Sequence, residues 1–297
     1  MKVTKNYFDV QGRSICYHVF LPEGNPIALV QIIHDASEHI LCYGDLARHL
    51  TDRGVIVCGC DLRGHAESVE EGKLGHFGEG KDLQILLDDQ KTLYDLMRKK
   101  YRYLPYLLLG QGIGGIVARL WMSTYHESVD GVMLAGVSEP KMNLAAAHIL
   151  AKLTALSGKD KPAPVLEEKL FGKGTMPSLA QEDLPTAFPL TAGALLQVLS
   201  SYGRVAIEEW TETIEQGLPV SIFCGAMDSV GGGEESGSLL HERLSMAELC
   251  TLSLKIYEKS GHFLHLSDEK EQYFADVEAF ALQVAEGVRA ARTASWY

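Results

Sequence analysis

The sequence lacks any long apolar run, and this absence argues against an integral membrane protein. No segment approaches the roughly eighteen uninterrupted apolar residues that a transmembrane helix needs. The first residues, Met1–Asp9, are polar and charged where a secretory signal would carry an apolar stretch. We therefore expect no integral membrane segment and a cytoplasmic location.

Basic charge is also scarce. Lys and Arg together number 27 against 39 Asp and Glu, which gives a formal net charge of −12. A chain this acidic is repelled by phosphate backbones and by anionic lipid surfaces. We therefore expect no nucleic-acid partner, and the sequence leaves the oligomeric state open.

Cysteine is sparse, with six residues, and their placement does not indicate a disulfide framework. Most lie in apolar, strand-like runs such as Val57–Cys60 and Phe223–Gly225, which suits buried thiols in a reducing compartment. Cys58 and Cys60 share one face of a strand, but no second pair or nearby histidine cluster completes a metal site. The sequence thus predicts no metal and no cofactor.

The remaining composition fits one large α/β domain spanning residues 1–297. Hydrophobic residues make up 46% of the chain, enough for a sizeable core. Short β-branched runs alternate with amphipathic stretches, which predicts a mainly parallel central sheet with helices on both faces. The predicted strands are Ile27–Ile33, Val55–Cys60, Tyr106–Leu109, Val129–Ala135, Val220–Cys224 and Leu252–Tyr257.

Two regions depart from this alternation. Near the start, Val3–Val10 and Ser14–Phe20 flank a Gln-Gly-Arg turn, which predicts an antiparallel hairpin at the sheet edge. Between residues 139 and 217, helical patterns such as Leu144–Leu156 are separated by Gly- and Pro-bearing loops. We interpret this second region as a helical cap inserted into the domain.

The most informative motif runs from an apolar strand through a glycine-rich turn into a helix. It reads Leu107-Leu108-Leu109-Gly110-Gln111-Gly112-Ile113-Gly114-Gly115. In a nucleophile elbow, glycines permit a sharp turn, the central side chain projects above the sheet, and the helix N-terminus supports negative charge. The frame fits, but the central residue is Gly112, which has no group that attacks a carbonyl.

A dinucleotide-binding turn is an alternative, because Gly110, Gly112 and Gly115 match the Gly-x-Gly-x-x-Gly spacing. The motif, however, follows several strands instead of opening the chain. Glu127 and Asp130 are also poorly placed to contact a ribose. A bare structural turn is the remaining interpretation.

Two further residues occur in the chain order of a hydrolase triad. Asp228 ends a small turn after one predicted strand, and His262 follows the next strand. With Gly112 at the nucleophile position, the order is nucleophile, acid and base. We assign Asp228 and His262 as the acid and the base. We do not assign His265, three residues later, as the base.

Together these segments resemble the monoglyceride lipase and lysophospholipase group of α/β-hydrolases, also grouped with the serine aminopeptidases (S33). Residues 34–39, His-Asp-Ala-Ser-Glu-His, are similar to the group's His-Gly-x-x-Glu-His. Residues 61–65 are similar to the start of Asp-x-Arg-Gly-His-Gly, and residues 228–231 to Asp-Pro-Val-Gly. The resemblance implies an α/β-hydrolase fold, descent from a carboxylic-ester hydrolase, and a small acyl-ester or acyl-like ligand.

The resemblance also implies roles for individual residues. The backbone N–H groups of Ala36 and Ile113 would form the oxyanion hole, whose donors are each worth about 2.7–4 kcal/mol to a tetrahedral intermediate. Asp61, Arg63 and His65 would be structural, holding the loop after a strand beneath the site.

Four positions depart from the group's pattern. Gly112 replaces the serine, Asp35 replaces a glycine of the oxyanion loop, Gln111 replaces a histidine, and Ala66 replaces the glycine after His65. Without the nucleophile, a triad enzyme retains only roughly 10³–10⁴-fold catalysis over water. An ionised Asp35 that points inward would also oppose the oxyanion.

Three explanations account for Gly112. An engineered change to trap a substrate would leave the other three positions unaltered, which argues against it. A natural pseudoenzyme that binds an acyl-type ligand or a protein partner explains all four departures. Alternatively, His262 with Asp228 activates a water in the space of the missing hydroxyl.

Neither a substitute nucleophile nor a definite pocket is evident. Ser37, Cys42 and Ser229 lie near the motifs, but none stands at the elbow, so we expect none to attack a substrate. Apolar residues of the cap would either form an acyl pocket above Gly112 or hold the cap to the core. They are Leu144, Ile149, Leu150, Leu153 and Leu156, and then Phe188, Leu190, Leu195, Leu196 and Leu199.

Overall fold

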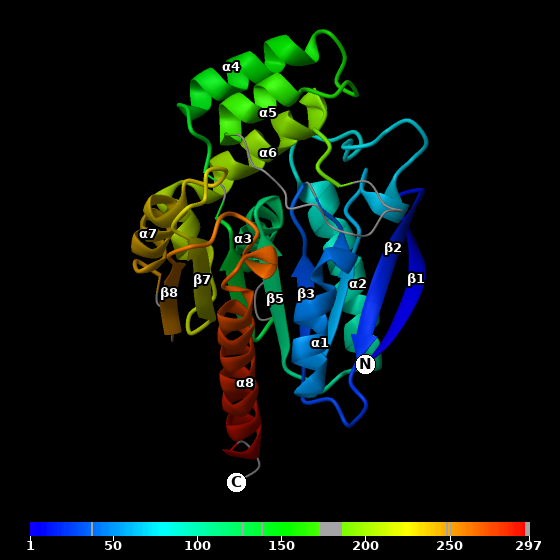
Figure 1. Cartoon of the computed structure of the whole chain (residues 1–297), viewed down its shortest axis with the longest axis vertical. Helices are drawn as coiled ribbons and strands as arrows, with labels where there is room; N and C mark the ends of the chain where they lie inside the picture. The colour runs from blue at the N-terminus through cyan, green and yellow to red at the C-terminus, as the bar shows by residue number, and fades with distance from the viewer. Residues whose placement is uncertain are drawn as a thin grey trace.

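The computed structural model describes residues 1–36, 38–125, 128–137, 139–172, 186–247, 249 and 251–294. Its centre is an eight-stranded sheet of order β1-β2-β4-β3-β5-β6-β7-β8 (Figure 1). The strands are β1 (Lys2–Val10), β2 (Arg13–Leu21), β3 (Ala28–Ile33), β4 (Val55–Cys60), β5 (Tyr106–Gln111), β6 (Gly131–Ala135), β7 (Pro219–Gly225) and β8 (Thr251–Tyr257).

Strand pairing confirms the predicted mainly parallel sheet and its edge hairpin. From β4 through β8 every neighbouring pair is parallel. β1 and β2 form the antiparallel hairpin, and β2 pairs antiparallel with β4. Because parallel strands end at the same edge, the loops after β3, β5, β7 and β8 lie together there.

Helices cover both faces of the sheet, since alternate residues of a strand point to opposite faces. In β3, Leu29 and Ile33 join one core cluster, whereas Val30 and Ile32 join the other. The second cluster includes residues of α1 (Gly44–Asp52) and α8 (Lys270–Ala294). The first includes residues of α2 (Gln84–Lys100), α3 (Ile113–Thr124) and α7 (Gly233–Leu244).

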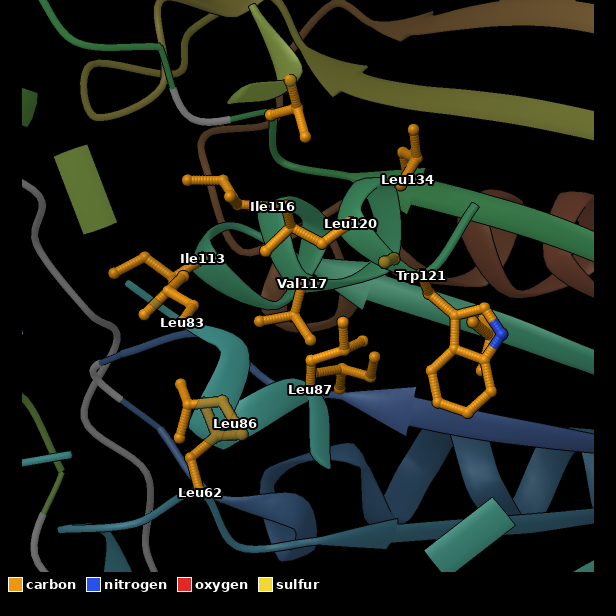
Figure 2. Close-up of a cluster of buried hydrophobic side chains, with 14 of the residues drawn as sticks. Leu62, Leu83, Leu86, Leu87, Ile113, Ile116, Val117, Leu120, Trp121 and Leu134 are labelled. Atoms are coloured by element: carbon orange, nitrogen blue, oxygen red, sulfur yellow. The ribbon is translucent and has the colours of Figure 1, made fainter. Parts of the chain in front are cut away.

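Helix α3, which follows the elbow, is buried along most of its length. Its Ile113, Val117 and Trp121 belong to the apolar cluster that Figure 2 shows, together with Leu83 and Leu87 near the start of α2. Full burial of such side chains contributes about 1.5–3 kcal/mol each. This packing fixes the helix N-terminus at the end of β5.

Between β6 and β7 the chain forms helices that lie together at one end of the molecule (Figure 1). They are α4 (Leu144–Ala155), α5 (Pro164–Phe171) and α6 (Ala192–Val205), followed by the 3₁₀ helix η3 (Glu208–Thr213). The helix predicted over Leu144–Leu156 is thus confirmed, while the cap boundaries at 139 and 217 stay a prediction. The other 3₁₀ helices are η1 (Ile40–Tyr43), η2 (Ala66–Ser68) and η4 (Leu264–Leu266).

The two apolar groups of this region behave differently. In the first, Ile149, Leu153 and Leu156 are exposed, so neither predicted role applies to them. In the second, Leu190, Leu195 and Leu199 are buried in the main core cluster. Among the described residues, no helix is both long enough and apolar enough to cross a bilayer.

Candidate active site

The elbow between β5 and α3 has the backbone of a nucleophile turn. Gly112 has φ +54° and ψ −117°, a conformation that glycine adopts without steric cost and that other residues adopt under strain. Its N–H donates to the carbonyl of Ala135 on β6 at 3.0 Å. The turn is therefore held by the neighbouring strand, although no side chain projects from its apex.

The space above the apex is filled by Asp35. A Cβ atom at position 112 would lie 2.2 Å from Oδ1 and 2.7 Å from Oδ2 of Asp35. Asp35 comes two residues after β3, and β3 pairs with β5, so the aspartate reaches the apex from the adjacent strand. Glycine at 112 and aspartate at 35 are thus sterically complementary.

Both oxygens of the Asp35 carboxylate are engaged. Oδ1 accepts a hydrogen bond from the N–H of Ile113 at 2.7 Å, and Oδ2 lies 3.1 Å from Nε2 of His262. The N–H of Ala36 also acts on this carboxylate. The two groups expected to form the oxyanion hole therefore already serve an anion of the chain itself.

The predicted acid and base lie together. Asp228 follows β7 and His262 follows β8, and Nδ1 of His262 is 2.8 Å from Oδ2 of Asp228. The N–H groups of Val230 and Gly231 donate to the other oxygen of Asp228 at 2.8 and 2.9 Å. The imidazole is thereby oriented from one side by Asp228 and from the other by Asp35.

The electrostatics of this buried Asp–His–Asp arrangement favour an imidazolium between two carboxylates. Burial alone would lower the pKa of His262, but Asp228 and then Asp35 outweigh it and raise that pKa to about 10. Burial likewise raises the pKa of each carboxyl, yet His262 and the backbone N–H groups hold both pKa values below their usual range. At neutral pH, His262 thus donates from both nitrogens and is unsuited to act as a base.

Sequence reasoning missed two interactions of this site, one a hydrogen bond and the other an electrostatic effect. Gln111, at the position of the group's histidine, donates from Nε2 to the carbonyl of His262 at 2.8 Å. Glu167 of α5 is close enough for the charge of Asp35 to help burial raise its pKa to about 7. The departure at Gln111 was a usable signal for the first contact, whereas nothing in the sequence indicated the second.

The residues assigned a structural role hold the loops beneath the site. Arg63 forms a buried bidentate pair with Asp89, at 2.6 and 2.8 Å. Nε2 of His65 lies 2.5 Å from the carbonyl of Ala36, and Asp61 accepts from the N–H of Ile40 at 3.2 Å. The Arg63 pair connects the loop after β4 to α2, and the contacts of His65 and Asp61 connect it to the segment that carries Asp35.

The remaining candidates lie outside this centre. His265 stacks on Tyr43 and its Nε2 is 3.0 Å from Oε2 of Glu38. Sγ of Cys42 accepts from the N–H of His39, and the carbonyl of Ser229 accepts from Lys141. Ser37 lies outside the described residues.

The geometry also bears on the dinucleotide interpretation. A pyrophosphate would require the free N–H groups at the N-terminus of α3. The first of them, from Ile113, is bonded to Asp35. A second anion at this place would meet a buried carboxylate, which disfavours a dinucleotide.

Known proteins share both the sequence pattern and the architecture. Residues 24–271 match the family model described as serine aminopeptidase, S33. Human monoglyceride lipase is 25% identical over 86% of this chain and 82% of its own length. A monoacylglycerol lipase of Mycolicibacterium smegmatis is 28% identical over 50% of this chain and 53% of its own.

Solved structures agree on the fold. A thermostable carboxyl esterase from Bacillus coagulans superposes with a TM-score of 0.85 at 20% identity, covering 96% of this chain and 99% of its own. A monoglyceride lipase from Saccharomyces cerevisiae gives 0.73 at 15% identity, with 94% of each chain covered. With its family match over most of its length and its α/β-hydrolase fold, the chain belongs to the serine aminopeptidase S33 family.

Proposed function

We propose that this monoglyceride lipase- and esterase-like α/β-hydrolase has lost serine-dependent ester hydrolysis and acts as a pseudoenzyme toward esters. One observation carries the proposal: the Asp35 carboxylate fills the nucleophile's space and takes the Ile113 N–H that an oxyanion would need. A small acyl-type ligand, suggested by the names of the relatives, would then be bound without turnover. A cytoplasmic location stays a prediction.

Water activation by His262 is the weaker alternative. A base must be deprotonated to accept a proton from water, whereas the pKa of His262 is raised to about 10. Its Nε2, the atom that would take the proton, faces Oδ2 of Asp35 at 3.1 Å. The pair Asp228 and His262 is therefore retained in geometry while its chemistry is blocked.

The test is hydrolysis of a short-chain aryl ester by four proteins: the unaltered chain, Gly112→Ser, Asp35→Gly and the double variant. We expect only the double variant to turn the ester over, because the serine Cβ needs the space of Asp35. Loss of a triad nucleophile costs roughly 10⁶-fold in kcat, so the gain should span several orders of magnitude. Adding His262→Ala to the double variant should abolish it.

Two outcomes would contradict the proposal. Turnover by the unaltered chain that disappears with His262→Ala would show that a different mechanism operates. Equal, measurable turnover by Gly112→Ser and the double variant would show that Asp35 does not block the site. A folded but silent double variant would place the loss beyond these two residues and support a purely binding role.

A further inference from the structure

A second cluster of chemically active side chains lies where the edge hairpin meets the parallel part of the sheet. β2 and β4 pair antiparallel with Tyr17 opposite Cys60. Continuing this register places Cys16 opposite Asp61, and the Asp61 N–H donates to the Cys16 carbonyl at 3.0 Å. His18, two residues after Cys16, lies on the same face of the strand.

The three side chains converge. Sγ of Cys16, a ring nitrogen of His18 and a carboxylate oxygen of Asp61 all lie within 4.8 Å of one another, and all three residues are buried. In the part of the chain that the structure describes, this is the one group of three His, Cys, Asp or Glu residues whose ligand atoms, one from each residue, all lie this close to one another. Ligands of these kinds around a tetrahedral ion stand about 3–4 Å apart, since their bonds to zinc are about 2.0–2.3 Å long.

One of these side chains lacks a partner. His18 is 4% exposed, and its Nδ1 is buried with no hydrogen-bond partner among the described residues. A buried imidazole nitrogen without a partner costs free energy, typically about 1–3 kcal/mol. Asp61 keeps spare capacity too, because among the described residues its oxygens accept from the N–H groups of Ile40 at 3.2 Å and Glu67 at 3.4 Å alone.

We propose that Cys16, His18 and Asp61 form a site for a divalent transition metal, with zinc as the preferred ion. A thiolate, an imidazole and a carboxylate form a donor set that zinc accepts, and the two anionic ligands neutralise its charge. On binding, a zinc–sulfur bond replaces the thiol S–H bond and the proton passes to solvent. One water molecule would complete the tetrahedral set of four ligands.

Such an ion would join segments that are far apart in the chain. Cys16 and His18 belong to the edge hairpin, whereas Asp61 begins the loop that carries Arg63 and His65. That loop contacts Ala36 through His65. The site is therefore structural: it would stabilise the hairpin and the loop that supports the Asp35 segment, independently of any ester chemistry.

The experiment uses the full-length chain without an affinity tag, stripped of metal by a chelator. Zinc binding is measured by calorimetry, and cobalt is added to detect the absorption band of a thiolate–cobalt bond. We expect one ion per chain, the thiolate band, and a Tm that rises with zinc concentration. Cys16→Ser and His18→Gln should weaken zinc binding by at least about 100-fold, more than loss of an outer-shell contact does.

Cys224→Ser is the matched control, because Cys224 is also a buried thiol on a sheet strand but lies on β7. It should leave the zinc affinity and the cobalt band unchanged. The proposal is overturned if the unaltered chain binds no zinc, or if folded Cys16→Ser binds zinc as tightly as the unaltered chain. Cobalt binding without the thiolate band would equally overturn it, and circular dichroism establishes that each variant is folded.

Discussion

The two halves of the candidate site have diverged in different ways. On the acid–base side, Asp228 and His262 keep the contact that a hydrolase needs, at 2.8 Å. On the nucleophile side, the elbow has the backbone of a nucleophile turn, but Gly112 stands at its apex and the Asp35 carboxylate fills the space above it. The comparison shows that the strand–turn–helix frame is determined by packing and does not depend on the serine it usually presents.

We expect the largest effect from the removal of His262, because this side chain contacts both halves of the site. His262→Ala leaves Asp35 and Asp228 as buried carboxylates without their common partner, and breaking a buried ion pair costs about 3–5 kcal/mol. We expect a loss of that size in the free energy of unfolding at pH 6, measured with urea.

His49→Ala is the control for this variant. His49 pairs with Glu278 at a partly exposed place, where such pairs are worth at most about 1 kcal/mol. Equal, small losses for the two variants would mean that Asp35 and His262 are not an ion pair. Partial recovery in the double variant Asp35→Asn with His262→Ala would strengthen the assignment.

A second prediction concerns how the stabilising effect of the Asp–His–Asp arrangement depends on pH. The pKa of His262 is raised from 6.5 to about 10, so its stabilising charge is complete below pH 6.5 and is lost as pH rises through 10. Asp35 and Asp228 have lowered pKa values, so they stabilise above pH 3.8 and lose this effect as pH falls through their folded-state pKa values. The pKa of Glu167 is raised to about 7. Its effect therefore lowers the free energy of unfolding as pH rises from 4.5 to 7.

We therefore expect the Asp–His–Asp arrangement to stabilise most between about pH 4 and 6.5. Asp35→Asn should lower the pKa of His262 by about 1–3 units, as removal of a close opposite charge does. Nuclear magnetic resonance of the imidazole nitrogens measures this shift, with Asp45→Asn, which removes an exposed carboxylate paired with Lys270, as control. An unchanged His262 pKa in Asp35→Asn would contradict the contact at Nε2.

The smallest expected effect concerns the loop that supports the nucleophile side. Ala66 has φ +40°, a conformation that costs a non-glycine residue about 1–2 kcal/mol. Glycine would remove this strain, but its greater conformational entropy in the unfolded chain offsets part of the gain. Ala66→Gly should therefore stabilise the chain by up to about 1 kcal/mol in thermal unfolding. Ala290→Gly, at an exposed position near the C-terminal end of α8, should destabilise the chain by up to about 0.5–1 kcal/mol.

Much of the fold was predictable because its signals are local. The strand Val55–Cys60 was predicted with its observed bounds. Strand β5 continues two residues beyond the predicted end at Leu109, since Gly110 and Gln111 still pair with β3 and β6. The strand predicted from Val129 begins at Gly131, because Asp130 is used to accept the N–H of Tyr106.

The site was predictable in its order and less so in its contacts. The chain order of Gly112, Asp228 and His262 is a sequence property, and the structure brings these residues together. The meeting of Asp35 with His262 depends on side-chain direction across 227 positions, which no local pattern encodes. The same holds for Cys16, His18 and Asp61. The sequence shows that Cys58 and Cys60 share a strand face, but the register that brings Cys16 opposite Asp61 is not a local property.

If a serine was lost at position 112, as we propose, the space that Gly112 and Asp35 share would also oppose its return. A mutation that restores serine first would place its Cβ against a buried carboxylate. A mutation that removes Asp35 first would leave the Ile113 N–H and the charged His262 without their anion. We therefore expect each single substitution to be less stable than the unaltered chain, so that, under the proposed loss of serine, packing would oppose its return by one substitution.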